Sequence, residues 1–169
     1  MALELALAVT FAGFLMLFWL TPLGVPTLRH LAQGEMPPDL RFGYRPHEAY
    51  RLIERYGPRG RAHWRRLLLL DMVFPAVYAA LFALLLLRWA DWVHAAPAWR
   101  LAAAAPLLAG ASDYVENVLL LKALRALPRR MASTLAAASF FTRAKFIFSW
   151  LTPVIPLAFC GWTVVSRFH

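Results

Sequence analysis

Three polar side chains interrupt an otherwise apolar stretch of the sequence, LLAGASDYVENVLLLKAL at residues 107–124. Asp113 and Glu116 are three residues apart, and Asp113 and Asn117 are four apart, so on an α-helix all three lie on one face. Two carboxyl groups beside an amide can bind a polar ligand or transfer a proton. These residues are therefore the first candidates for chemistry in this chain.

Charged residues are rare in this chain, which is too apolar for a soluble domain. Of its 169 residues, 61% are hydrophobic and 16% are charged, whereas a soluble domain is about 45 to 50% apolar. A bilayer core of roughly 30 Å is crossed by about 20 residues of helix. The predicted transmembrane helices span residues 5–25, 67–88, 100–123 and 144–166. The predicted fold is all-α, a polytopic membrane protein with one four-transmembrane-helix bundle over residues 1–169.

The fourth helix has an alternative start, since MASTLAAASFF at residues 131–141 also suits a helix. Orientation follows from the Lys and Arg residues, which number nine in the first loop and six in the third, against two in the second loop and one in the tail. Positive residues favour the cytoplasmic side, so both termini are predicted outside the cytoplasm. The predicted location is the cell membrane, which in a bacterium is the inner membrane. The net charge of +9 is explained by this topology and by anionic lipids, and we predict no nucleic-acid partner.

This topology places the scattered polar residues together. Asp71 is expected near the cytoplasmic end of the second span, with Tyr78 about two turns deeper. Arg143 and Lys145 begin the fourth span on the same side, level with Glu116 if the last two helices form a hairpin. Acids at membrane depth cost several kcal/mol unless they are paired, protonated or hydrated. We therefore expect them to face a polar pocket in the cytoplasmic half of the bundle.

The leading prediction is that this pocket binds or acts on a lipid or small amphiphile. Each candidate has an expected role: Asp71, Asp113 and Glu116 as binding or acid/base carboxyl groups, Arg143 and Lys145 as partners of these acids or of an anionic headgroup, and Tyr78 and Asn117 as groups that orient the ligand. Whether binding leads to a reaction stays open, and no cofactor is predicted from the residues.

The first cytoplasmic loop, residues 29–66, contains RPHEAYRLIERYGPRGRAHWRR. Pro46 suits a helix start and Gly57-Pro58 a stop, and apolar residues between them recur at helical spacing. The prediction is a short amphipathic helix on the membrane surface, with its arginines near lipid phosphates. His47 and His63 lack the paired spacing of a zinc helix, so no metal site is predicted.

Two other functions compete with ligand binding. The intramembrane polar residues of an assembly or helper subunit would only hold helices, a second copy or a protein partner together. A small proton-coupled carrier would use the same acids for transport. The sequence contains no nucleophile elbow, glycine-rich phosphate loop or dinucleotide fingerprint, and Cys160 stands alone in an apolar run.

The segments GPRGRAHWRRLLLLDMVFPAVY and ASDYVENVLLLKAL resemble small bacterial four-helix membrane proteins of unassigned function, a resemblance that covers most of the chain and implies no activity. The layout is also similar to the EXPERA family of sterol isomerases and sigma-2-like ligand-binding proteins. That family has four helices, a long first loop and an acid followed by a proline on the second helix, matched here by Asp71 and Pro75. The chain departs from it at the end of the first helix, which lacks an acid, and in the acids of the third helix.

Overall fold

A computed structural model describes the backbone of residues 2–165 and the side chains of residues 2–162. Every regular element in this part of the chain is a helix, which confirms the all-α fold class. The long helices are α1 (Ala2–Leu20), α3 (Pro46–Leu70), α4 (Phe74–Trp92), α5 (Ala104–Arg125) and α6 (Ala132–Val165), and the short ones are α2 (Val25–Leu31), η1 (Pro38–Leu40) and η2 (Pro97–Ala103). The fourth predicted helix thus takes its alternative, earlier start, and its predicted end at residue 166 lies outside the described residues.

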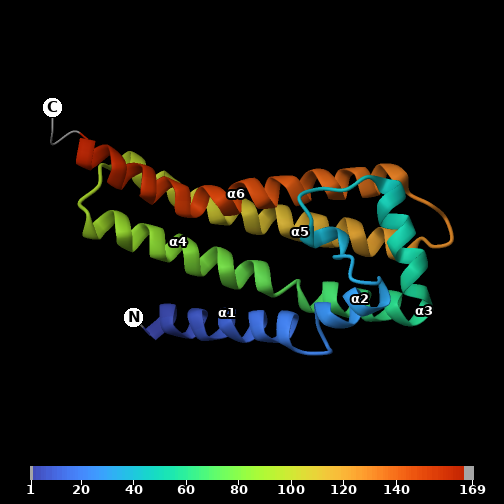
Figure 1. Ribbon diagram of the computed structural model, residues 1–169. Coiled ribbons are helices and arrows are strands. Elements are labelled where there is room, and N and C mark those ends of the chain that lie inside the picture. Colours follow the sequence, from blue (N-terminus) through green and yellow to red (C-terminus); the bar gives the residue numbers. More distant parts are fainter. Residues whose placement is uncertain (1, 166–169) are drawn as a thin grey trace.

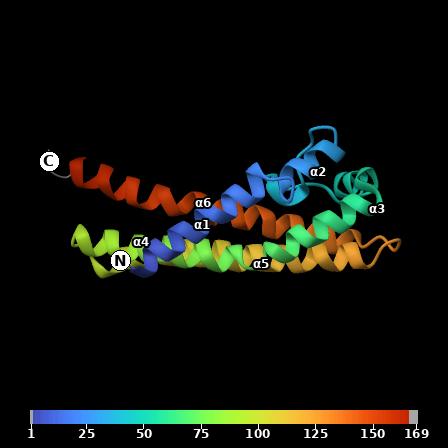
Figure 2. The same ribbon diagram turned by 90° about the horizontal axis from the view of Figure 1, so that it is seen from below.

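Four of these helices, α1, α4, α5 and α6, run side by side along the length of the molecule (Figure 1). α5 packs most extensively on α6 and then on α4, whereas α1 packs mainly on α4 and α2. The start of α1, the end of α6 and the η2 connection lie at one end, and α2, η1 and α3 cover the other (Figures 1 and 2). We call the latter the α3 end.

Three helical segments are long and apolar enough to cross a membrane, residues 2–31, 46–92 and 132–162. α5 is not among these three, and its buried Asp113, Glu116 and Asn117 lower its hydropathy. The outward faces are strongly apolar, with Val9 on α1 and Trp150 and Leu157 on α6 exposed. An all-helical protein compatible with a membrane is therefore confirmed.

The second predicted span is interrupted where the sequence places Asp71. α3 ends at Leu70 and α4 begins at Phe74. Pro75 has no N–H to donate to the carbonyl of Asp71, four residues earlier, and its ring clashes with that carbonyl in a regular helix. The break therefore follows from Pro75, and it leaves the carboxylate of Asp71 half-buried between the two helices.

The amphipathic segment of the first loop forms the first half of α3, which starts at Pro46 as predicted. A kink divides α3 at Gly57, whose φ of 60° is in the left-handed region that glycine favours. The apolar face of this segment is covered by protein and not by the membrane surface: Leu52 and Ile53 are buried in one core with Leu120 of α5 and Leu135 of α6. The expected membrane-surface contact of this face is wrong, because apolar spacing marks a face that needs cover without specifying whether lipid or protein supplies it.

Candidate functional site

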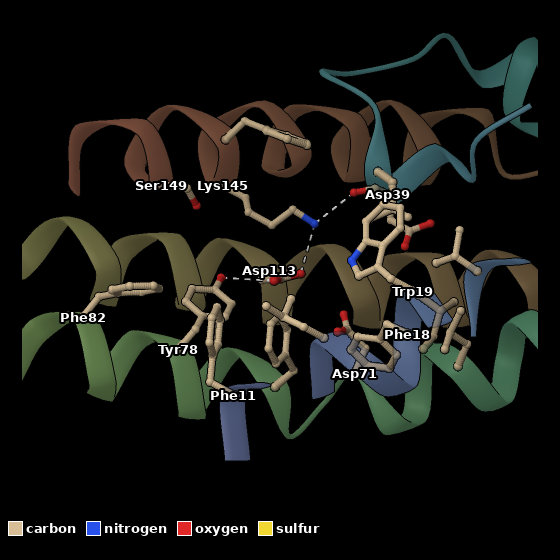
Figure 3. A pocket seen from close by; sticks show the side chains of 17 residues that line it. Phe11, Phe18, Trp19, Asp39, Asp71, Tyr78, Phe82, Asp113, Lys145 and Ser149 are labelled. Atoms are coloured by element: carbon tan, nitrogen blue, oxygen red, sulfur yellow. Dashed lines mark hydrogen bonds and ion pairs between the residues drawn. The ribbon is translucent and has the colours of Figure 1, made fainter. Parts of the chain in front are cut away.

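A cavity of about 300 Å³ lies among α1, α4, α5, α6 and η1, toward the α3 end. Its walls are mostly aromatic and aliphatic, with Phe11 and Phe18 from α1 and Phe82 from α4. Figure 3 shows these rings on one side and the polar groups of α5, α6 and η1 opposite them. Both its size and its apolar lining are typical of small-molecule sites, whose volumes run from about 300 to 1,000 Å³.

The amino group of Lys145 on α6 is the centre of the polar side of the cavity (Figure 3). Its Nζ lies 2.6 Å from Oε2 of Glu116, 3.2 Å from Oδ1 of Asp113 and 3.1 Å from the backbone oxygen of Asp39. An ammonium group has three N–H donors, and here it faces three acceptor oxygens. The predicted ion pair between the last two helices is therefore present through Lys145.

Further hydrogen bonds tie the acids to neighbouring helices. Tyr78 of α4 donates its hydroxyl to Oδ2 of Asp113 at 3.1 Å. Thr142 of α6 donates to Oε1 of Glu116 at 2.5 Å, and Glu116 itself is completely buried and does not line the cavity. Glu116 is thus placed to hold Lys145, whereas Asp113 presents its carboxylate to the cavity.

Asp71 accepts one hydrogen bond, from Nδ2 of Asn117 at 2.7 Å. The amide oxygen of Asn117 is buried without a hydrogen-bond partner among the described residues. Asp71 lines the cavity, and no Lys, Arg or His of the described chain lies within ion-pair distance of its carboxylate. The charge of Asp71 is therefore compensated by one amide donor and by no cation at contact distance in the described chain.

Three predicted site residues do not line the cavity: Glu116 and Asn117, which lie behind it and bond residues that do, and Arg143, which lies apart from it. The side chain of Arg143 is exposed and lies against Gly43, where an added Cβ would come within 2.3 Å of its Nε. Residues two apart on a helix point to nearly opposite faces, so Lys145 and Arg143 cannot both face the cavity. The expectation that both cations meet the acids is wrong for Arg143.

Asp39, which sequence analysis did not single out, completes the polar side of the cavity from η1. Its carboxylate accepts a hydrogen bond from Nε1 of Trp64 at 3.2 Å, and its backbone oxygen contacts Lys145. Burial raises the pKa of Asp39, and the nearby charge of Lys145 opposes that rise. No periodic pattern marks an acid in this loop, and only its fixed position after Pro37 and Pro38 could have suggested a rigid turn.

The loop that carries Asp39 is itself fastened to α3. Glu35 pairs with Arg41 at 3.1 Å, Arg51 at 3.0 Å and Arg55 at 2.5 Å. The hydrogen bond from Arg41 is the main reason that the pKa of Glu35 is lowered. Farther along, the backbone N–H of Tyr44 donates to Oγ of Ser139 on α6 at 2.8 Å. These contacts hold η1 over the α3 end of the cavity.

A second cavity, of about 290 Å³, adjoins the first and shares Tyr78, Phe82 and Ser149 with it. Its remaining lining comes from α5 and α6 and is largely apolar, with Ala109 and Pro153 among its residues. Together the two cavities run from the carboxyl groups at the α3 end toward the middle of the helices. The arrangement suits a molecule with one polar end and one apolar end.

The described residues contain no group of three or more His, Cys, Asp or Glu side chains arranged to hold a metal ion. Comparison of the chain with known protein families, with curated proteins and with solved structures gives no match in any of the three.

Proposed function

We propose that this protein is a four-helix integral membrane protein that binds, or acts on, a lipid or small amphiphile in the cavity beside Lys145. In this proposal α5 is the fourth transmembrane helix, because it packs between α4 and α6 and buries its acids against them. Both termini lie outside, and the α3 end lies in the cytoplasm, as the distribution of Lys and Arg favours. The similarity in layout to the EXPERA family remains a prediction.

The observation that carries this proposal is the division of the cavity into an apolar part and a charged part. Aromatic rings of α1 and α4 form one wall, Asp113 and Lys145 stand opposite them, and Asp71 lies beside the rings (Figure 3). A purely structural ion pair needs no adjoining space, and a cavity beside buried charges costs stability through lost packing. A ligand that fills the space and contacts the charges would compensate both costs.

The cavity-facing residues have distinct roles in this proposal. Asp71 and Asp113 contact the polar end of the ligand and are the acid/base groups of any reaction, while Tyr78 and Asn117 fix the orientation of these carboxyl groups. Glu116 lies outside the cavity lining and positions Lys145 through their ion pair.

Mass spectrometry of molecules that co-purify with the protein in native-like lipid tests the proposal. Ser149→Phe places a ring where both cavities meet, and Ser133→Phe makes the same change at an exposed residue of the same helix that lines neither cavity. We expect a bound amphiphile with the wild type and with Ser133→Phe, and its loss with Ser149→Phe. If Ser149→Phe retains every molecule that the wild type carries, the cavity is not the binding site.

A second candidate, an assembly or helper subunit, is favoured by one observation. Several polar contacts of the site join two helices, as Tyr78 joins α4 to α5 and Thr142 joins α6 to α5. For such a subunit we expect no co-purified amphiphile in any variant. Asp113→Asn would then reduce stability or capture of a protein partner and nothing else.

A further inference from the structure

Arg143 carries an exposed guanidinium group whose charge no acid of the described chain compensates. The sequence has nine Asp and Glu residues, all of them described, and none forms an ion pair with Arg143. Lys145, two residues farther along α6, is by contrast paired with Asp113 and Glu116. One cation of α6 is therefore satisfied within the protein, whereas the donors of the other are available to a group from outside it.

In the proposed topology Arg143 stands where α6 enters the membrane. About 20 helical residues cross the hydrocarbon core, and the fourth span predicted from the sequence begins at residue 144, directly after Arg143. The α3 end is the cytoplasmic end, so this guanidinium group lies level with the phosphate groups of the inner leaflet. An arginine at this depth keeps its methylene groups among apolar atoms and extends its charge toward the headgroups.

The loop before α3 determines the path of the Arg143 side chain. This loop lies against α6 (Figure 1), and the N–H of Tyr44 donates to Oγ of Ser139, one turn before Arg143. The Arg143 side chain crosses the backbone at Gly43, where an added Cβ would overlap Nε and crowd Cγ and Cδ. Gly43 also has a φ of 82°, in the left-handed region that glycine favours. A long side chain that is already positioned loses less conformational freedom when it binds.

Exposed apolar side chains flank this guanidinium group. Phe140 and Ile147 lie three residues before and four residues after Arg143, on the same face of α6, and both are exposed. Phe42, next to Gly43 in the loop, is exposed as well. A soluble anion or an acidic protein surface would pair with the charge and leave these apolar groups in water. A phospholipid has both a phosphate for the cation and apolar chains for its flanks.

We infer that Arg143, positioned by Gly43, binds the phosphate of an anionic phospholipid in the cytoplasmic leaflet, and that the glycerol and acyl chains of this lipid cover the apolar side chains beside it. A guanidinium group can bind two phosphate oxygens at once. The first and third loops carry nine and six Lys and Arg residues, which favour an anionic lipid over a zwitterionic one. This site lies outside the cavity, and the inference rests on the membrane placement in the proposed function and not on the cavity ligand.

The test measures labelling of residues 140–147 by photoreactive phosphatidylglycerol and phosphatidylcholine that share their acyl chains and reactive group. Each lipid is present in trace amount in phosphatidylcholine nanodiscs that hold the purified protein, and the ratio of the two yields reports the headgroup preference at this position. We expect the wild type to prefer phosphatidylglycerol by about fivefold, which corresponds to about 1 kcal/mol. Arg143→Gln should lose this preference.

Arg129→Gln is the matched control for charge. Arg129 is exposed, forms no ion pair within the described chain and precedes α6, whose first residue is separated from Arg143 by about 16 Å of helix. This separation exceeds the Debye length of about 8 Å at physiological salt, so Arg129→Gln should change the preference by less than about twofold. Circular dichroism and thermal unfolding verify that each variant is folded.

Gly43→Ala tests the positioning without removing the charge. A Cβ there would displace the Arg143 side chain, so the preference for phosphatidylglycerol should fall. Gly34→Ala is the matched control, because Gly34 has a similar φ of 90° and no atom within 4 Å of an added Cβ. Gly34→Ala should therefore keep the preference. An equal loss in both variants would overturn the positioning role of Gly43.

Equal labelling by the two lipids in the wild type, or a preference that survives Arg143→Gln, would overturn the inference. Replacement of chloride by inorganic phosphate at equal ionic strength separates a lipid from a soluble ligand. A preference that persists supports the lipid headgroup. A preference that disappears shows that a soluble phosphate binds Arg143 and overturns the lipid assignment.

Extraction of membranes with alkaline carbonate separates failure of this inference from failure of the proposed function. Release of the protein would contradict its membrane placement, and the lipid site would fall with it. A protein that stays in the membrane but shows no headgroup preference at Arg143 would overturn the lipid site alone.

Discussion

Lys145 and Glu116 form an ion pair with an Nζ to Oε2 distance of 2.6 Å, in which the Glu116 side chain is completely buried and that of Lys145 is 13% exposed. The pair joins α6 to α5, the two helices with the most extensive contact in the structure. Because Asp113 and Asp39 approach the same ammonium group, one cation compensates several acceptors. The charge balance of the site therefore depends on Lys145 more than on any single acid.

Lys145→Met should destabilise the protein strongly. Removing one partner of a buried pair leaves uncompensated charge and costs about 3 to 5 kcal/mol. Glu116→Gln should cost less, because Lys145 keeps Asp113 and the amide oxygen can still accept from Thr142. Lys122→Met, at an exposed position of α5, is the control and should change stability by no more than about 0.5 kcal/mol. Unfolding in one detergent gives all three values, and equal stability of Lys145→Met and Lys122→Met would contradict the prediction.

Tyr78→Phe should affect ligand retention more than folding. The substitution removes the hydroxyl that donates to Asp113 at 3.1 Å and keeps the ring that packs on Phe74. Asp113 retains Lys145, so the expected loss of stability is about 0.5 to 1.5 kcal/mol, the net value of one hydrogen bond. In the same preparations, mass spectrometry should find less co-purified amphiphile than in wild type. The second part of the prediction fails if stability falls while the bound amphiphile is unchanged.

Glu35→Gln should produce a loss of stability that depends on pH. The arginines around Glu35, first of all Arg41, lower its pKa in the folded state. A carboxyl group with a lowered folded pKa stabilises the protein above its unfolded pKa of about 4.3, and this contribution disappears as the pH falls through the folded pKa. We therefore expect Glu35→Gln to be less stable than wild type by about 0.5 to 1 kcal/mol at neutral pH and to approach it at about pH 3.

Unfolding of wild type and Glu35→Gln over this range measures the effect. Glu54→Gln is the comparison, because Glu54 pairs with Arg130 at the surface with 62% of its side chain exposed. Glu54→Gln should change the free energy of unfolding only slightly at every pH. A Glu35→Gln deficit that is the same at pH 7 and pH 3 would rule out the ionised Glu35 cluster as its cause.

The position of the acids on α5 and their need for a cation could be predicted from the sequence, because both depend only on residue spacing and residue type. Helical spacing places Asp113, Glu116 and Asn117 on one face, and the cost of an unpaired acid in an apolar segment requires a partner from another helix. A hairpin between the last two helices then brings Lys145 to the right level. In the structure Lys145 pairs with both Asp113 and Glu116, while Asn117 donates to Asp71 instead.

Other features depend on tertiary contacts that no local pattern encodes. Asp39 reaches the cavity because the loop before α3 folds back over α6, with Tyr44 bonded to Ser139, 95 residues later. The apolar face of the first half of α3 could equally have been covered by lipid. The helix break at Asp71, by contrast, needs no tertiary contact. Pro75 has no N–H to donate to the carbonyl of Asp71, so the interruption of the helix follows from local geometry.

Gly110→Ala should weaken the contact between α5 and α4. A Cβ at Gly110 would lie 2.9 Å from Cβ of Ala79 and 3.1 Å from the backbone oxygen of Pro75, and neither atom is the far end of a flexible side chain. The crowding should cost about 1 to 3 kcal/mol, more than the gain of up to about 1 kcal/mol from replacing glycine in a helix. Gly13→Ala is the matched control, because an added Cβ there has no neighbour within 4 Å.

Thermal unfolding of the two variants in the same detergent should separate them, with Gly13→Ala at or above the wild-type midpoint and Gly110→Ala below it. Gly110 lies against Pro75, the residue that causes the helix break after Asp71. Crowding in Gly110→Ala should therefore displace α4, and the shape of the cavity should change with it. Gly110→Ala should therefore retain less co-purified amphiphile than Gly13→Ala. If both variants unfold together, α4 and α5 are not in the close contact that places Tyr78 against Asp113, and the geometry argued for the cavity loses its support.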